Sequence, residues 1–103
     1  MSLSFEWDAR KSAVNRRKHG VSFEEATTVF GDRMAAIFDD DRHSANELRE
    51  IMVGYSERSR LLIVSFLESA GVVRIISARK ATKRERLNHE ENKIRKASQE
   101  HGE

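Results

Sequence analysis

The chain has 103 residues, of which 38% are hydrophobic, and its 19 Lys and Arg against 17 Asp and Glu give a net formal charge of +2. This length predicts one domain over residues 1–103 with one modest core. Without cysteine, the chain can form no disulfide scaffold, thiolate zinc site or cysteine nucleophile. Its longest apolar run, residues 34–38, is far shorter than the roughly 20 residues of a membrane helix. We therefore expect a cytoplasmic protein that does not contact a membrane.

The first third of the chain predicts a short strand and two helices. Residues 5–7 alternate apolar and polar side chains, as a strand does. Asp8 is a suitable N-cap for a helix over residues 9–19, and Gly20 suits the left-handed residue that ends such a helix. The Ser-Phe-Glu-Glu sequence at residues 22–25 is a capping box, which opens a second helix.

Strand-like patterns then follow in four segments, residues 34–38, 48–55, 61–67 and 72–78. The connections between them are short and favour antiparallel neighbours, so we expect a meander. The third segment is apolar except for Ser65, which is typical of a central strand covered on both faces.

A second capping box, Thr82 with Glu85, opens a charged C-terminal helix that reaches about residue 98. Its apolar residues are too few to bury a broad face, so this helix is expected to project or to dock on a partner. The predicted class is α+β, with two N-terminal helices, an antiparallel β-meander of about four strands plus a short N-terminal strand, and a C-terminal helix.

Charge is segregated along the chain. Residues 9–20 hold five bases and no acid, and residues 74–96 hold nine bases against three acids. Residues 38–50 hold five acids against two bases. Such a polarised domain can dock a polyanion on its basic side. Solvated helix faces with ion pairs four residues apart would produce the same pattern.

The residue types permit RNA cleavage without a metal, in which the 2′-hydroxyl attacks its own phosphate. This reaction needs a base, fixed cations for the developing charge and an acid for the leaving oxygen. His43, Glu47, Arg49 and Arg79 can supply these groups if the second and fourth meander strands face one groove. Arg79 lies four positions after Ile75, so regular strand alternation gives the two residues the same parity and predicts their side chains on the same face. The four histidines show no metal-ligand spacing and each also fits a surface or structural role, so we expect no metal or other cofactor.

Several motifs resemble the BrnT family of toxins over about residues 5–91: Phe5-Glu6-Trp7-Asp8, Lys18-His19-Gly20, Glu47-Leu48-Arg49 and Ile76-Ser77-Ala78-Arg79. BrnT proteins are ribonuclease toxins of type II toxin–antitoxin systems with a RelE-like fold, and their antitoxin, BrnA, carries a ribbon-helix-helix DNA-binding domain. The resemblance implies an endoribonuclease that a BrnA-like antitoxin neutralises. The toxin would contact operator DNA only through that antitoxin.

The resemblance also suggests roles for individual residues. The expected catalytic residues are cations that hold the phosphate and the transition state, and side chains that transfer protons: Lys11, Arg49 and Arg79 for the first role, His43, Glu47 and His89 for the second. Further RNA contacts are expected from Arg10, Lys18, Arg74, Lys80, Lys83, Arg84 and Arg86. Family members usually have Tyr where this chain has His89, which either replaces it as a proton carrier or alters activity. Leu87 and Ile94 are expected to bind the antitoxin.

Two other functions would use the same basic surface. A nucleic-acid-binding module would bind RNA and leave it intact, with an affinity that falls steeply with salt. A protein-interaction subunit would bind an acidic partner and ignore nucleic acid. Incubation with RNA in EDTA separates these alternatives from the enzyme.

Overall fold

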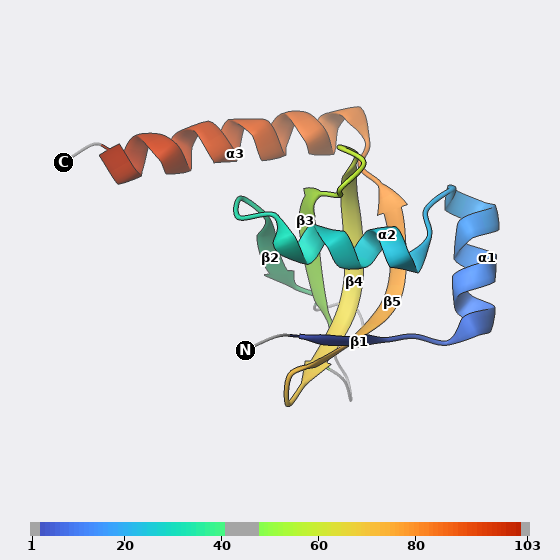
Figure 1. Ribbon diagram of the computed structural model, residues 1–103. Coiled ribbons are helices and arrows are strands. Elements are labelled where there is room, and N and C mark those ends of the chain that lie inside the picture. Colours follow the sequence, from blue (N-terminus) through green and yellow to red (C-terminus); the bar gives the residue numbers. More distant parts are fainter. Residues whose placement is uncertain (1–2, 41–47, 102–103) are drawn as a thin grey trace.

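The computed structural model describes residues 3–40 and 48–101, and in the last helix it describes side chains up to residue 92. In chain order the elements are β1 (Ser4–Glu6), α1 (Ala9–His19), α2 (Phe23–Thr28), the 3-10 turn η1 (Val29–Gly31), β2 (Ala36–Asp39), β3 (Glu50–Tyr55), β4 (Leu61–Ser69), β5 (Val72–Lys80) and α3 (Lys83–His101). A five-stranded sheet has α2 on one face, α1 along one edge and α3 across one end (Figure 1). The predicted α+β class is confirmed.

The sheet has the strand order β1-β5-β4-β3-β2. Strands β2 to β5 form the predicted antiparallel meander, with β4 at the centre. The short N-terminal strand returns to the far edge, where it pairs in parallel with β5 from Ser4↔Val72 to Glu6↔Arg74. Strand β3 begins at Glu50, two residues later than predicted, because its ladder with β2 ends at the Asp39↔Glu50 pair.

The predicted helix signals are confirmed by the observed caps. The Asp8 carboxylate accepts the backbone N–H groups of Arg10 at 2.8 Å and Lys11 at 3.1 Å. Gly20 ends α1 with a left-handed φ of 70°, a conformation that glycine adopts without strain. The Ser22 hydroxyl accepts the backbone N–H of Glu25 at 3.0 Å and opens α2.

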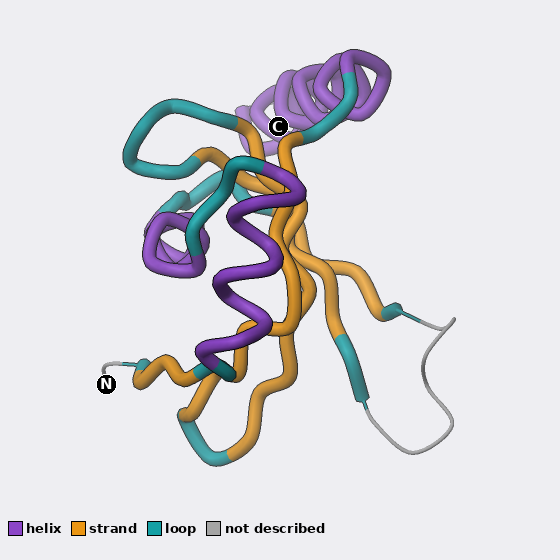
Figure 2. The backbone as a smooth tube through the Cα atoms, turned by 90° about the vertical axis from the view of Figure 1, so that its right-hand side faces the viewer, coloured by secondary structure: helices purple, strands orange, loops and turns teal. Residues whose placement is uncertain are grey.

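The hydrophobic core lies on one face of the sheet, under α2 and η1. Figure 2 shows α2 beside that face, and α1 along the neighbouring edge. The core joins the inward side chains of the helical segments to those of β3, β4 and β5: Val21, Phe23, Ala26, Val29, Met52, Leu62, Val64, Phe66, Val73, Ile75 and Ala78.

The other face of the sheet is only partly covered. Ile63, Ser65 and Leu67 point to this face from β4 and are half-buried, so the expectation of complete cover on both faces is wrong here. Helix α2 lies on the opposite face and α1 along the edge. The N-terminal half of α3 covers only one end of the partly covered face (Figure 1). This partly covered surface is called the open face below.

Helix α1 is fixed along the free edge of β5 by one buried amide. Strand β1 pairs with β5 only over residues 72–74, so on that side of β5 no strand lies beside Ala78. The Asn15 side chain takes that place: its Nδ2 donates to the Ala78 carbonyl at 2.8 Å, and its Oδ1 accepts the Ala78 N–H at 3.1 Å. The same Nδ2 donates to the Val21 carbonyl at 3.0 Å. The basic residues of α1 are thereby held beside the open face.

Candidate functional site

A β-bulge places Arg79 on the open face. Ser65 pairs with Ser77, whereas Phe66 pairs with Ile75, which leaves Ile76 without a partner on β4. The extra residue shifts the alternation of β5 by one position. Ile75 therefore faces the core while Arg79 faces the opposite side, and the prediction that the two share a parity is wrong.

Two cross-strand rows form the floor of the open face. One row runs from Ile51 through Ser65 to Ser77, and the other runs from Val53 through Ile63 to Arg79. A hollow of about 190 Å³, which we call the central hollow, is lined by His19, Asp40, Arg49, Ile51, Ile63, Ser65, Ser77, Ala78 and Arg79. It combines an apolar floor with hydroxyl, imidazole and guanidinium groups and the carboxylate of Asp40.

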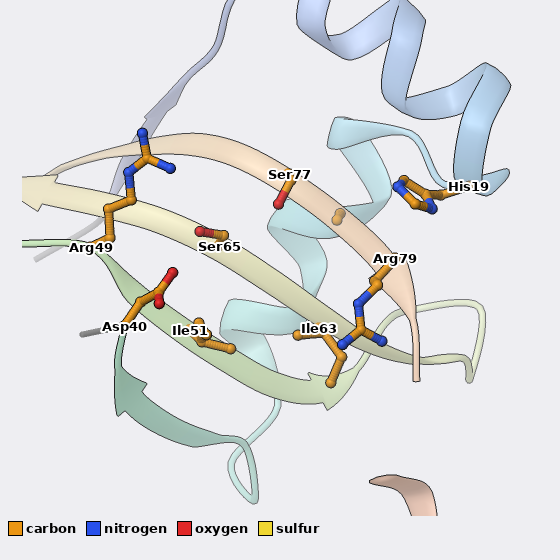
Figure 3. Close-up of a pocket in the computed structure, with 9 residues that line it drawn as sticks. His19, Asp40, Arg49, Ile51, Ile63, Ser65, Ser77 and Arg79 are labelled. Carbon is orange, nitrogen blue, oxygen red and sulfur yellow. The ribbon is translucent and has the colours of Figure 1, made fainter. Parts of the chain in front are cut away.

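The two arginines of the central hollow lie toward its two ends. Figure 3 shows Arg49 at one end and Arg79 at the other, with Ser65 and Ser77 between them and His19 nearer to Arg79. Arg49 comes directly before β3, and its carbonyl accepts the backbone N–H of Asp40 at 2.9 Å. An anion bound along this hollow would have a guanidinium toward each end (Figure 3).

A carboxylate on α3 orients Arg79. The Nη1 and Nη2 atoms of Arg79 donate to the two oxygens of Glu85 at 2.8 and 2.9 Å. Glu85 is in turn fixed by the predicted capping box: it accepts the Thr82 N–H at 2.8 Å, and its own N–H donates to the Thr82 hydroxyl at 3.1 Å. The Arg79 guanidinium lowers the pKa of Glu85 to about 2, and Glu85 raises the pKa of Arg79. Glu85 therefore stays ionised and holds the guanidinium in one orientation.

A second hollow adjoins the first beside α1. This α1 hollow, of about 330 Å³, is lined by Arg10, Lys11, Val14, Asn15, Lys18, His19, Ile76 and Ser77. It shares His19 and Ser77 with the central hollow. Three basic residues of α1 thus lie next to the central hollow, on a helix that Asn15 fixes to the sheet: Arg10, Lys11 and Lys18. A polyanion could cross from one hollow to the other.

The N-terminal half of α3 forms a third hollow with the sheet. This α3 groove, of about 250 Å³, is lined by Ala36, Phe38, Ile51, Val53, Ile63, Arg79, Glu85, Asn88, His89 and Asn92. His89 is only 6% exposed, and its ring packs edge-on against Tyr55 at 5.9 Å between centroids. The Tyr55 hydroxyl donates to Glu90, a contact that raises the pKa of Tyr55 and ties α3 to β3.

Other predicted RNA-binding residues lie outside the central and α1 hollows: Arg74, Lys80, Lys83, Arg84 and Arg86. Arg74 lies near the start of β5 and pairs with Glu6 at 3.1 Å. Lys80 and Arg86 line a separate hollow beside Tyr55 and Arg60. Lys83 and Arg84 are exposed in the first turn of α3.

His43 and Glu47 lie outside the described residues, as does the side chain of Ile94. Leu87 is exposed on α3. Within the described ranges, no three His, Asp or Glu side chains gather as a metal site. No helix of the described chain is both long and apolar enough to cross a membrane.

The structure adds site residues that the sequence did not single out for this role. His19 appears in the Lys18-His19-Gly20 motif, next to the glycine that ends α1, and a structural role explains that position equally well. Ser65 is the one polar residue of an otherwise apolar segment, a signal that marks the open face. Glu85 is predictable as a helix cap, but its ion pair with Arg79 depends on the packing of α3 against β5.

Fold and site together define a small α+β domain that gathers arginine, lysine and histidine side chains on the open face of its sheet. Among solved structures, the chain is similar to the crystal structure of the Brucella abortus ribonuclease toxin BrnT, with a TM-score of 0.63 and 22% identity over 80% of this chain and 100% of that chain. At this identity the likeness shows the fold. No curated protein matches.

The family model described as the ribonuclease toxin BrnT of type II toxin–antitoxin systems matches residues 7–85. The chain therefore belongs to the BrnT family, and the predicted family membership is confirmed. The RelE-like description of the fold stays a prediction.

Proposed function

We propose that this chain is an endoribonuclease toxin that cleaves RNA at the central hollow without a metal ion. The family is one of ribonuclease toxins. One observation supports the site most strongly: Arg49 and Arg79 line the same hollow as His19, and Lys11 lies in the hollow that adjoins it. This arrangement supplies a guanidinium toward each end of one hollow, with that of Arg79 held by Glu85, and an imidazole nearer to Arg79 (Figure 3).

In this proposal Arg49 and Arg79 hold the scissile phosphate, and Lys11 holds a neighbouring one. The 2′-oxygen forms a bond to phosphorus as the bond to the 5′-oxygen breaks, and the products are a 2′,3′-cyclic phosphate and a 5′-hydroxyl. A base removes the proton of the 2′-hydroxyl, and an acid delivers one to the 5′-oxygen. The arginines neutralise the charge that grows on the phosphate oxygens.

His19 is the histidine that lines the central hollow in the described structure, and we assign it one of the two proton transfers. His43 and Glu47 are proposed for the other. They fall in the sequence between Asp40 and Arg49, both of which line the hollow. His89 lines the α3 groove instead, where it adjoins Arg79.

We also propose that the toxin acts in the cytoplasm and is neutralised by a BrnA-like antitoxin with a ribbon-helix-helix domain, which alone would contact operator DNA. Membership of a toxin–antitoxin family supports an antitoxin partner. Leu87, exposed on α3, and Ile94, further along the same helix, are the proposed apolar contacts. Co-expression of such an antitoxin is expected to abolish growth arrest, and Leu87→Asp to weaken that rescue.

Incubation of the purified chain with RNA in EDTA tests the enzymatic proposal. We expect cleavage to 2′,3′-cyclic phosphate ends, and no cleavage of a 2′-O-methyl RNA of the same sequence. RNA that is retained but intact would instead support the nucleic-acid-binding module. A chain that neither binds nor cleaves RNA would support the protein-interaction subunit.

A further inference from the structure

The α3 groove carries binding features that phosphate cleavage does not use. Its floor is apolar and includes Phe38, Val53 and Ile63. Its wall on α3 presents the polar side chains of Asn88 and Asn92. At about 250 Å³ the groove lies just below the usual range of ligand pockets, so it suits a compact ring better than a large ligand.

The groove also has unmatched hydrogen-bonding capacity. His89 lines it, and the buried Nε2 atom of this residue has no partner within the described part of the chain. A buried polar atom without a partner is costly, and such atoms in native proteins often mark a functional site. The amides of Asn88 and Asn92 each offer a donor and an acceptor to the same space.

Arg79 connects this groove to the proposed cleavage site, because it lines both the α3 groove and the central hollow. A phosphate bound by Arg79 would bring its own nucleotide to the mouth of the groove. Phe38, 51% exposed on β2, offers an aromatic face within it. Proteins recognise unpaired RNA bases by stacking on such rings and by hydrogen bonds to base edges.

We propose that the α3 groove binds one nucleobase of the RNA, next to the phosphate at Arg79, and sets the base preference of cleavage. The proposal rests on the proposed function of the central hollow. The Arg79 guanidinium at the mouth, an apolar floor and two amides in the wall favour a flat polar ring, with its phosphate outside the groove, over a protein segment. The Glu85 carboxylate, which also lines the groove, favours a ring that presents N–H donors. The Glu85–Arg79 and Tyr55–Glu90 contacts hold α3 over the sheet, so the groove is formed before the ligand binds.

Titration of the purified chain with the four ribonucleoside 3′-monophosphates, followed by NMR, tests this subsite without requiring cleavage. We expect at least one nucleotide to shift the side-chain amide signals of Asn88 and Asn92, and ribose 5-phosphate to leave them unchanged. Asn92→Ala is expected to weaken the binding of that nucleotide about tenfold, which is the effect of losing one hydrogen bond. The binding of ribose phosphate should be unaltered. Glu91→Ala, an exposed change on the same helix but outside the groove, is the matched control.

The cleavage pattern gives the second readout. The double variant Asn88→Ala with Asn92→Ala is expected to change which base lies beside the cut, whereas Arg79→Ala slows every cut. Equal amide shifts with ribose phosphate, or an unchanged pattern in an active double variant, would overturn the subsite. A chain that cleaves no RNA but binds nucleotides in the groove would overturn the proposed function and leave the base site standing. Loss of antitoxin binding in Asn92→Ala, with no nucleotide binding in the parent, would assign the groove to the protein partner.

Discussion

Two glutamates of the described residues each form a bidentate pair with an arginine, and the two pairs lie in contrasting places. The side chain of Glu25 is 4% exposed and that of its partner Arg60 is 27% exposed. In the second pair, Glu85 and Arg79 are 36% and 41% exposed. The first pair joins α2 to the start of β4, and the second joins α3 to the open face.

The surroundings of each pair decide its role. Glu25 also accepts the Ser56 hydroxyl at 2.6 Å, and Arg60 also donates to the Gly20 carbonyl at 3.1 Å, so the first pair is closed off by the fold. Arg79 keeps its Nε–H and one Nη2–H without a partner in the described part of the chain. The same two functional groups therefore hold the fold in one place and present an oriented cation in the other.

The largest difference between the pairs is expected in stability. Arg60→Ala leaves the buried Glu25 carboxylate unpaired, so it should lower the free energy of unfolding by about 3 kcal/mol. Glu85→Ala breaks a half-exposed pair and should cost less than about 1 kcal/mol. Urea unfolding followed by circular dichroism measures both. An equal cost for the two variants would contradict the contrast, and the double variant Glu25→Leu with Arg60→Met should recover most of the first loss.

The second difference is expected in catalysis. Glu85→Gln removes the charge that orients Arg79, so RNA cleavage should fall roughly tenfold, the effect of a misplaced transition-state donor. Glu90→Gln removes the same charge from the same helix beside Tyr55 and should leave the rate near that of the parent. Faster cleavage by Glu85→Gln would show that Glu85 shields Arg79 from RNA instead of orienting it.

A smaller effect is expected from the α1 hollow. Lys11 lies one hollow away from the arginines, so Lys11→Ala should weaken RNA binding and lower the salt dependence of log K by about 0.7, the contribution of one phosphate contact on a single strand. Arg17→Ala, on the same helix but outside this hollow, is the control. An unchanged salt slope for Lys11→Ala would remove Lys11 from the RNA path.

The smallest effect concerns acid stability. Because the pKa of Glu85 is lowered to about 2 from 4.5, its contribution to stability is present above pH 4.5 and is lost as the pH falls toward 2. The free energy of unfolding of the parent should therefore fall by more than that of Glu85→Gln over this window. Solvent screening keeps the difference below about 1 kcal/mol. A difference in the free energy of unfolding between the two proteins that stays constant from about pH 5 to 2 would contradict the lowered pKa of Glu85.

Features set by neighbouring residues were predictable from the sequence. The capping residues Asp8, Ser22 and Thr82 act on backbone groups two or three positions away, so their motifs alone locate three helix starts. The strand patterns predicted all five strands, each with its ends within two residues of those observed. Membership of the family followed from the order of its motifs.

Features set by distant partners were not predictable. The bulge at Ile76 arises where β5 changes register against β4, so counting along β5 alone put Arg79 on the wrong face. His19 joins the site only because Asn15 fixes α1 to the edge of β5, across 63 positions in the sequence. The roles of His43 and Glu47 stay predictions.

The most direct test compares two arginines of one strand. Arg79 lies in the central hollow and pairs with Glu85, whereas Arg74 lies near the other end of β5 and pairs with Glu6. Cleavage of RNA in EDTA should fall about 100-fold or more in Arg79→Ala, the usual effect of losing one preorganised transition-state donor. Arg74→Ala removes only one peripheral phosphate contact, so its rate of RNA cleavage should fall less than about tenfold. Equal losses in the two variants, or an Arg79→Ala protein as active as the parent, would contradict the placement of the active site in the central hollow.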